Sequence, residues 1–571
     1  MQNDRRDFLK YLGGTAATFG LTGIAFTSCK PSSHVTANKK TTPEQTLEVS
    51  EKGAIVETKY GKIRGYRRNG IYTYKGIPYG ASTTGENRFM APKEPLPWNG
   101  IRNALMWGNA APAEAGLGDP FEPNFEHFDS DFTYQWGHRR FSEDCLSVNV
   151  WTPSINDNVK RPVLVWFHGG GFAGGSSHEL NAYDGENLSR VGDAVVVSVN
   201  HRLNVFGFLN LGIAGGEKYK DSATAGMQDC VAALKWVNKH INLFGGDPSN
   251  VTIFGQSGGG AKVSILMAMP EAKGLFHRAM TISGAALKVA SYDSQAETAN
   301  NLLKAAGISP GQLNKLQEMP WRNLMELTRT SRNIGHFAYS PCLDGIHIPR
   351  HPFDPDAPAI SAGIPMMIGS CTGERSYSAN DPSLEDITFN DLKERLRSTK
   401  GGTGGLLGGA PSFGDRTGEV VDAYANAFPE KKPVEIWSMI GGRNGQIIQA
   451  EKQTANGGAV YNYWFDWATP LYDGRPRAYH NTDISFWFNN TDVMETITGG
   501  GTRPRNLAEK MSLALIQFAK TGNPNHKGLP NWPKFNKEEG AVMILNDTCL
   551  VRNDPDRSAR MLVNEIRNTN S

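Results

Sequence analysis

Residues 251–263 read Val-Thr-Ile-Phe-Gly-Gln-Ser-Gly-Gly-Gly-Ala-Lys-Val. The first four residues are typical of a buried strand, and the last ones are compatible with a helix. Between them, glycine stands two positions before and two positions after Ser257, where it lets strand and helix approach closely and lets the backbone adopt strained angles. The pattern predicts a nucleophile elbow, a sharp strand-to-helix turn that presents the Ser257 hydroxyl at the end of a sheet.

Alone, the G-x-S-x-G pattern of residues 255–259 is weak evidence for catalysis. Glycine accounts for 63 of the 571 residues, so a chance match is common in such a chain. A structural turn in which Ser257 only caps the following helix fits the same five residues. The rest of the chain has to distinguish these two interpretations.

Short apolar segments rich in β-branched residues recur before and after this turn. Residues 163–167 and 194–199 are nearly continuous apolar runs, which is typical of strands buried on both faces. Further short strands are predicted at residues 54–58, 61–65, 279–283, 365–369 and 460–465, and a helix at residues 223–244. Because strands alternate with long helical segments, we predict an α/β fold with a mostly parallel central sheet covered by helices on both faces.

The sequence His168-Gly169-Gly170-Gly171-Phe172 directly follows the predicted strand 163–167. The loop after a parallel strand opens at the edge of the sheet where active sites lie. Consecutive glycines let backbone N–H groups converge on one point without side chains in the way. Ahead of a G-x-S-x-G turn, we interpret this loop as a donor of hydrogen bonds to an oxyanion, each worth about 3 kcal/mol of transition-state stabilisation.

A serine nucleophile also needs a base and an acid that orients the base. In folds of this type the acid and then the histidine follow the serine along the chain. Six histidines lie after Ser257, namely His277, His336, His347, His351, His480 and His526. His480 is favoured, because it alone follows a strong predicted strand, residues 459–467, through a loop with proline and glycine.

Glu374 is the favoured acid, since it follows the predicted strand 365–369 by a short loop. Asp344, Asp354 and Asp356 remain alternatives, although they lie in a proline-rich connection. The residues themselves thus predict Ser257 as nucleophile, His480 as base and Glu374 as acid.

The first fifty residues are predicted to be an export signal and a tether. Asp4-Arg5-Arg6-Asp7-Phe8-Leu9-Lys10 is similar to a twin-arginine signal, and the apolar residues 11–26 follow it. Phe26-Thr27-Ser28-Cys29 is similar to a bacterial lipoprotein cleavage box, in which Cys29 would become the lipid-bearing first residue. We predict a signal peptide over residues 1–28, a flexible tether over 29–50 and one domain over 51–571, in a protein that is periplasmic or anchored by lipid. An uncleaved anchor is the alternative for the first segment.

Composition excludes some partners and says little about others. A net charge of +2 gives no electrostatic reason to expect nucleic acid, and membrane contact is expected only through a lipid on Cys29.

Five cysteines follow Cys29, an odd number without metal-ligand spacing, so at least one is free and all are expected to be buried small hydrophobic residues. Two stretches, residues 109–141 and 401–409, are predicted as surface loops, the first alternatively as a cap over the site.

Several longer stretches resemble the type-B carboxylesterase family of the α/β-hydrolase superfamily, which includes cholinesterases and bacterial p-nitrobenzyl esterases. The resemblance extends over residues 54–535 in the family's order and spacing. It is carried by Glu143-Asp-Cys-Leu-Ser-Val-Asn-Val-Trp, His168-Gly-Gly-Gly-Phe, Val199-Asn-His-Arg-Leu-Asn-Val-Phe-Gly-Phe-Leu, Phe244-Gly-Gly-Asp-Pro-Ser-Asn-Val-Thr-Ile-Phe-Gly-Gln-Ser-Gly-Gly, Ala478-Tyr-His-Asn-Thr-Asp-Ile-Ser-Phe-Trp-Phe and Phe518-Ala-Lys-Thr-Gly-Asn-Pro.

The resemblance implies an α/β-hydrolase fold with the same three catalytic residues, Ser257, Glu374 and His480. It implies oxyanion donors at Gly170, Gly171 and Gly258, and a structural ion pair of Arg88 with Glu143 or Asp144. The family usually has glutamate before the nucleophile and alanine after it, whereas this chain has Gln256 and Gly258. Loss of the carboxylate argues against a cationic substrate. The family's disulfide at Cys145 has no upstream partner here apart from Cys29.

The sequence as a whole is interpreted as an exported serine carboxylesterase that acts on a small-molecule ester through an acyl-enzyme, with no metal or organic cofactor. Two alternatives stay open. One is a cholinesterase-like adhesion protein without catalysis, a class whose members typically lose a triad residue. The other is a hydrolase of thioester or amide bonds.

Overall fold

The computed structural model describes residues 46–569, apart from 114–139, 331–337 and 399–412. The predicted signal peptide, Cys29, nearly all of the predicted tether, most of the 109–141 stretch and the glycine-rich residues 401–409 therefore lie outside the described residues. Within the described helices, none combines the length and the apolar character that a membrane span requires.

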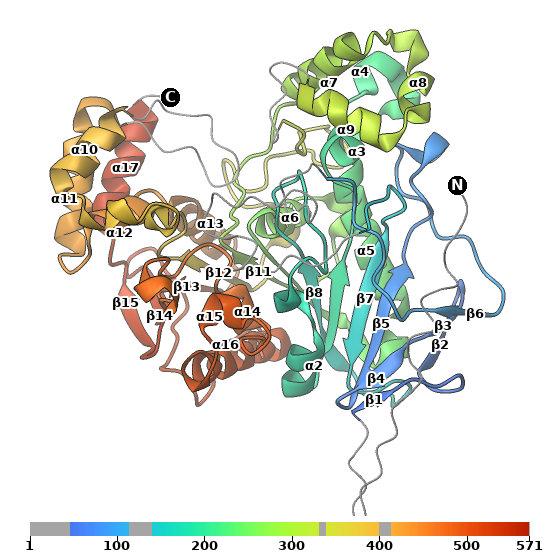
Figure 1. Ribbon diagram of the computed structural model, residues 1–571, viewed down its shortest axis with the longest axis horizontal. Coiled ribbons are helices and arrows are strands. Elements are labelled where there is room, and N and C mark those ends of the chain that lie inside the picture. Colours follow the sequence, from blue (N-terminus) through green and yellow to red (C-terminus); the bar gives the residue numbers. More distant parts are fainter. Residues whose placement is uncertain (1–45, 114–139, 331–337, 399–412, 570–571) are drawn as a thin grey trace, which may run out of the picture. The chain divides into compact units, whose positions relative to one another are not determined.

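A twelve-stranded sheet runs through the domain (Figure 1). In spatial order its strands are β1 (Leu47–Glu48), β4 (Tyr66–Arg68), β5 (Ile71–Pro78), β7 (Ser147–Thr152), β9 (Val195–Val199), β8 (Arg161–Phe167), β10 (Gly246–Gln256), β11 (Arg278–Ile282), β12 (Met366–Cys371), β13 (Val460–Phe465), β14 (Ala541–Leu545) and β15 (Leu550–Asn553). Neighbours from β9 to β14 pair in parallel, and the strands at both ends pair antiparallel. A small second sheet contains β2 (Ile55–Thr58), β3 (Gly61–Arg64) and β6 (Ile101–Asn103).

Helices pack on both faces of the large sheet because its central strands are apolar on both sides. On β8, Val163, Val165 and Phe167 belong to one hydrophobic core, whereas Leu164 and Trp166 belong to another. The first core includes apolar residues of α5 (Ala225–His240), α6 (Gly258–Leu266) and α13 (Asn444–Ala455). The second includes those of α14 (Ile484–Trp487) and α16 (Thr502–Thr521).

The remaining helices form groups around the sheet (Figure 1). One group comprises α4 (Gly212–Gly215), α7 (Tyr292–Ala306), α8 (Asn314–Glu318) and α9 (Trp321–Thr330). A second, with its own small core, comprises α10 (Phe389–Ser398), α11 (Thr417–Ala427), α12 (Pro433–Met439) and α17 (Arg557–Thr569). The others are α2 (Glu186–Gly192), α3 (Asn204–Phe208) and α15 (Glu495–Thr498).

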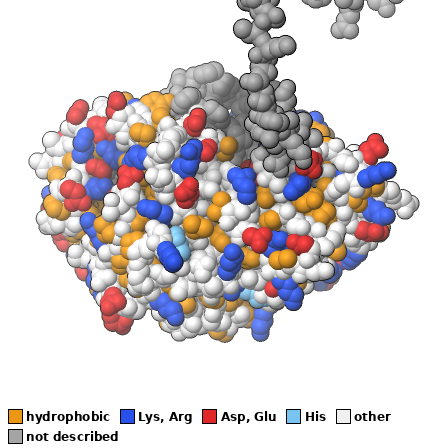
Figure 2. Space-filling model, turned by 90° about the horizontal axis from the view of Figure 1, so that it is seen from below, with side chains coloured by type: hydrophobic (Ala, Val, Ile, Leu, Met, Phe, Trp, Pro, Cys, Tyr) orange, Lys and Arg blue, Asp and Glu red, His pale blue; other side chains and the backbone are white. Residues whose placement is uncertain are grey.

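The surface carries charges of both signs. On the face seen in Figure 2, acidic and basic side chains are interspersed, and apolar side chains lie scattered among them. Many of the exposed charges are paired with each other, as in the Lys59–Glu94 contact of 2.7 Å. This mixture agrees with the near-neutral charge of the chain, and this face offers a polyelectrolyte no extended area of one sign.

The predicted α/β architecture is confirmed, and each predicted strand corresponds to an observed one. One segment boundary needs correction. Leu47 and Glu48, at the end of the predicted tether, pair antiparallel with Arg68 and Arg67 and form the edge strand β1. The short run was too polar to be recognised as a strand, since an edge strand needs no apolar alternation when both of its faces are exposed.

Candidate active site

Ser257 lies in the turn between β10 and α6, at the N-cap position of the helix, where its side chain makes no capping hydrogen bond. Its backbone adopts φ 54° and ψ −120°, a conformation that costs free energy for a residue other than glycine. The Ser257 N–H donates to the Ile282 carbonyl of the neighbouring strand at 2.8 Å, and the Ser257 carbonyl accepts from Ala261 N in the first turn of α6. The predicted strained strand-to-helix turn is therefore present, and two backbone hydrogen bonds hold it in place.

The glycines on both sides of Ser257 are required by close approach of the backbone. A methyl group at Gly259 would lie 1.9 Å from the Phe167 carbonyl oxygen at the end of β8. One at Gly255 would lie 2.5 Å from the carbonyl carbon of Gly259. Both distances are far below contact distance, so the elbow and the neighbouring strand can pack this closely only with glycine at these positions.

The loop that follows β8 lies against the elbow. A methyl group at Gly169 would lie 3.6 Å from Ser257 Cβ, and one at Gly258 would lie 2.2 Å from the Gly171 oxygen. Gly170 and Gly171 have φ of +77° and +62°, which favours glycine at both positions. Two predicted oxyanion donors, Gly171 and Gly258, thus pack against each other beside Ser257, and the third, Gly170, precedes Gly171 in the same loop.

Glu374 and His480 meet at the carboxyl ends of β12 and β13. The Glu374 Oε2 atom and His480 Nδ1 form a short hydrogen bond. The other oxygen, Oε1, accepts from Ser283 Oγ at 2.5 Å and from Cys371 N at 2.9 Å. Since Glu374 is only 9% exposed, these donors replace the water that would otherwise solvate its charge.

Gln256 connects the elbow to this pair. Its amide nitrogen lies 2.9 Å from His480 Nε2 and 3.4 Å from Nδ1. An amide nitrogen can only donate, so the contact at 2.9 Å requires a lone pair on Nε2, while Glu374 requires a proton on Nδ1. Both neighbours therefore select the neutral tautomer with its lone pair on Nε2, and the Gln256 contact has to break when Nε2 accepts the proton of Ser257.

The loops that carry Glu374 and His480, residues 372–379 and 475–480, are tied to each other. Hydrogen bonds join them directly: Gly373 N to the Ala478 carbonyl at 3.0 Å, Ser376 Oγ to the Pro476 carbonyl at 2.5 Å, and Arg475 Nη1 to the Ser378 carbonyl at 2.7 Å. The acid and the base are consequently held in register by the backbone of the loops as well as by their own contact.

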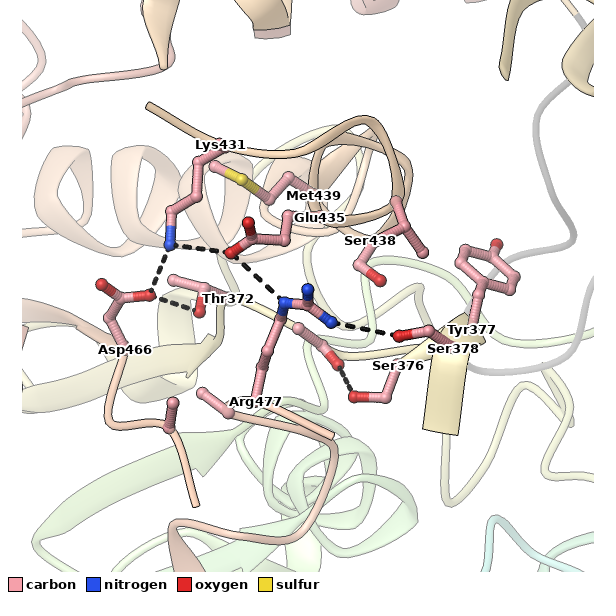
Figure 3. Close-up of a pocket in the computed structure, with 14 residues that line it drawn as sticks. Thr372, Ser376, Tyr377, Ser378, Lys431, Glu435, Ser438, Met439, Asp466 and Arg477 are labelled. Atoms are coloured by element: carbon pink, nitrogen blue, oxygen red, sulfur yellow. Dashed lines mark hydrogen bonds and ion pairs between the residues drawn. The ribbon is translucent and has the colours of Figure 1, made fainter. Parts of the chain in front are cut away.

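A cluster of charged side chains reinforces this connection from α12 and the end of β13 (Figure 3). Arg477 pairs with Glu385 at 2.7 Å and with Glu435 of α12 at 3.4 Å. Lys431 joins the same Glu435 to Asp466, at 3.3 and 3.4 Å. The Arg477 guanidinium lowers the pKa of the Glu385 carboxyl to about 2, so this carboxyl is ionised at neutral pH.

A second buried carboxyl, Asp483, lies near Glu374 and accepts from Tyr463 Oη at 3.0 Å. Burial, and then the charge of Glu374, raise the pKa of Asp483 to about 7. At neutral pH a large share of Asp483 is therefore protonated, which limits the repulsion between the two carboxylates.

Two further sequence expectations concern structural residues. Arg88 pairs with Glu143 rather than Asp144, with 2.6 Å between Nε and Oε1, and both side chains are buried. The five cysteines after Cys29 are all free and buried. They are, as predicted, small hydrophobic residues of the interior: Cys145, Cys230, Cys342, Cys371 and Cys549.

Sequence reasoning missed the partners of the acid and the base. Ser283 could have been found, since it ends the predicted strand 279–283 and strand ends had already located Glu374. Gln256 had been noted only for the charge it lacks, and no local pattern indicates that its amide contacts His480.

Known proteins resemble this chain in sequence and in structure. The model of the carboxylesterase family matches residues 52–560. The chain is 33% identical to the para-nitrobenzyl esterase of Bacillus subtilis over 517 residues, 89% of this chain and 97% of that protein. It is 30% identical to the phenmedipham hydrolase of Pseudarthrobacter oxydans, over 86% of this chain and 95% of that one. Among solved structures, a carboxylesterase of Geobacillus stearothermophilus superposes with a TM-score of 0.72 at 34% identity, covering 89% of this chain and 99% of the other.

Proposed function

Because this chain belongs to the carboxylesterase family and is a carboxylic ester hydrolase, we propose that it works through an acyl-enzyme formed on Ser257. His480 takes the Ser257 proton as the hydroxyl attacks the ester carbonyl, and then gives that proton to the leaving alcohol. Water attacks the acyl-enzyme by the same route and releases the acid. The observation that carries the proposal is the contact of His480 with Glu374 beside the strained Ser257 turn.

Each remaining group has a role in this sequence. Glu374 keeps the proton on Nδ1 and favours the imidazolium that forms when Nε2 accepts the serine proton. The N–H groups of Gly170, Gly171 and Gly258 donate hydrogen bonds to the carbonyl oxygen as negative charge develops on it. The N-terminus of α6, at Ser257, adds a partial positive charge on the same side.

The family and the residue before Ser257 define the substrate class only in part. The family implies small-molecule esters, and the residue before Ser257 is the neutral Gln256 rather than a carboxylate. A site without that negative charge offers no counter-ion to a cationic alcohol. We therefore infer neutral esters as substrates, and a simple neutral aryl ester is the appropriate assay.

A fluorophosphonate probe tests the nucleophile and its base together. Such a probe phosphonylates a serine only when the hydroxyl is activated by a neighbouring base. We expect mass spectrometry of the labelled protein to locate the probe on Ser257, and the labelling rate to fall at least ~100-fold in His480→Ala. His526→Ala, which alters a histidine that the sequence also left open, serves as the matched control and keeps its labelling. Capture of the probe by another serine refutes the assignment.

We also propose that the protein is exported and anchored by a lipid on Cys29. The proposal is supported by the twin-arginine-like residues 4–10 and the cleavage-box-like residues 26–29. In a bacterium fed an alkyne-tagged fatty acid, we expect the full-length chain to carry the tag and to sediment with membranes, and Cys29→Ser to lose both properties. Cys549→Ser, a cysteine far along the chain, should lose neither. Tag incorporation that survives Cys29→Ser rules out this anchor.

A further inference from the structure

One buried cation lies directly beneath the predicted oxyanion loop. Lys262 is the fifth residue of α6 and is fully buried, with 0% exposure. Its Nζ donates to the Gly171 carbonyl at 2.9 Å and to the His168 carbonyl at 3.1 Å. Burial of an ammonium is costly unless its charge is compensated, so its presence at this position calls for a physical explanation.

The two carbonyls that Lys262 holds lie at either end of the donor segment. The His168 carbonyl belongs to the peptide group that precedes Gly169, and the Gly171 carbonyl belongs to the one that follows Gly171. Between these two peptide groups lie the N–H groups of Gly170 and Gly171. Fixing both ends of so short a glycine segment restricts the rotation of the peptides in the middle, which glycine alone would leave free.

Gly258 is matched to this arrangement. The space that a methyl group at position 258 would fill is occupied by Gly171, whose O, Cα and N atoms would lie 2.2, 2.5 and 2.5 Å away. The hydrogen bond from Lys262 to the Gly171 carbonyl and the absence of a side chain at Gly258 have the same effect. Both allow the Gly171 backbone to pack against the first turn of α6. The departure from alanine at position 258 is thereby linked to a residue four positions later.

We propose that Lys262 is a positioning residue of the oxyanion hole, which orients the glycine loop and places a positive charge beside the forming oxyanion. The inference rests on the proposed function of Ser257. A preorganised charge in a site of low dielectric stabilises developing negative charge without reorganisation during the reaction. The cation acts through the loop and does not touch the substrate.

The charged and titratable groups around Lys262 come from four elements. Glu179, in the loop after β8, and Cys230 of α5 favour its charged form. His168 and His201, which stack with ring centroids 5.0 Å apart, face it from the ends of β8 and β9. Burial, and then the charge of Lys262, hold the pKa of His168 and His201 well below the ordinary range, so both imidazoles are neutral. Behind Cys230, Arg202 and Asp229 form a buried ion pair of 2.7 Å with each other.

This setting predicts a pH dependence. Burial lowers the pKa of Lys262 to about 8. Above that pH the ammonium loses its charge and one of its N–H groups, so kcat falls as pH rises through about 8. His480 does not cause such a decline, because the base must be deprotonated to act and a rise in pH only favours that form.

The test compares wild type with Lys262→Met and Lys262→Arg. With a neutral aryl ester, we expect Lys262→Met to lower kcat by about 10- to 100-fold, less than the ~10²- to 10³-fold that follows loss of a direct donor, and to leave KM within about twofold. A trifluoromethyl ketone, which binds as an oxyanion adduct of the serine, should lose affinity by the same factor as kcat/KM. The alkaline decline near pH 8 should vanish in Lys262→Met, and in Lys262→Arg it should be absent while part of kcat returns, because a guanidinium stays charged.

Lys452→Met is the matched control. Lys452 also donates to a backbone carbonyl, that of Phe353 at 2.7 Å, but it lies on α13. Its loss should leave kcat and the pH profile unchanged. If Lys262→Met fails to fold, the wild-type enzyme still tests the inference, since a kcat and an inhibitor affinity that stay flat from about pH 7 to about pH 10 refute it.

The outcomes separate this inference from the proposed function. If Ser257→Ala abolishes hydrolysis while Lys262→Met keeps kcat, inhibitor affinity and the alkaline decline, only the role of Lys262 is wrong. If Ser257→Ala remains active, the proposed nucleophile fails, and the role of Lys262 fails with it. A loss of thermal stability in Lys262→Met without a change in kcat or pH profile also overturns the inference, because it indicates a structural role alone.

Discussion

Ser257→Ala is expected to lower kcat for a neutral aryl ester by at least ~10³-fold, to the residual level that oxyanion donors and binding supply without a nucleophile. The serine hydroxyl is the only group at the elbow that the proposed mechanism joins covalently to the acyl group. Its removal leaves the strained turn and the Gly170, Gly171 and Gly258 donors in place. KM should therefore change little, and the effect should be confined to kcat.

Steady-state kinetics with the purified variant, with thermal unfolding to confirm the fold, measure this expectation. The methyl group of alanine fits the space of the serine side chain, so a melting temperature close to wild type is expected. Ser249→Ala is the matched control, since Ser249 is an exposed serine whose side chain bonds only locally to Asp247. A Ser257→Ala enzyme that keeps more than about a tenth of wild-type kcat would remove Ser257 from the mechanism.

Glu374→Gln is expected to lower kcat by ~10³- to 10⁴-fold, although the change is isosteric. Ser283 Oγ and Cys371 N both donate to Oε1 of Glu374, so in the variant the amide oxygen takes that position. The amide nitrogen then faces His480 Nδ1 and donates to it. His480 then keeps its lone pair on Nδ1 only in the tautomer with its proton on Nε2, which displaces the Gln256 amide and cannot accept the proton of Ser257.

A second variant tests whether the loss arises from the tautomer of His480. Ser283→Ala with Glu374→Gln removes one of the two donors that orient the amide and leaves Cys371 N, so the double variant should lose less activity than the product of the two single effects, whereas independent effects would multiply. Asp354→Asn, which alters an alternative acid from the sequence, should change kcat by less than about twofold, because Asp354 pairs with Lys288 at the surface. Near-wild-type kcat in Glu374→Gln, or a large loss in Asp354→Asn, would show that the acid is misassigned.

Much of the fold and the main site residues could be predicted because they follow from local rules. The strand 163–167 is apolar on both faces, so its burial in a parallel sheet was readable from the residues alone. Glycine at positions 255 and 259 indicated a sharp turn. The structure shows why glycine is needed there, since a methyl group at Gly259 would lie 1.9 Å from the Phe167 carbonyl oxygen. Glu374 and His480 follow strands, and the ends of parallel strands meet at one edge.

The residues that could not be predicted act across long sequence separations. Ser283 and Glu374 are 91 positions apart, and Gln256 and His480 are 224 apart. Neither contact has a spacing that a pattern could reveal. Lys262 looked like an ordinary residue of a helix, and only packing of α6 under the loop after β8 turns its side chain toward the His168 and Gly171 carbonyls.

The connection between the loops 372–379 and 475–480 has a consequence for motion in the site. Backbone and side-chain hydrogen bonds, with the Arg477 ion pairs, join these loops into one mechanical unit that carries both the acid and the base. Ser257 lies at the junction of β10 and α6, which reaches this unit through the contact of Gln256 with His480. Thermal breathing of the sheet should therefore leave the Glu374–His480 distance almost constant and vary the distance from His480 to the serine oxygen. The proton of Ser257 is transferred across the boundary between these two parts, so their relative motion should affect the rate of attack before it affects the Glu374–His480 pair.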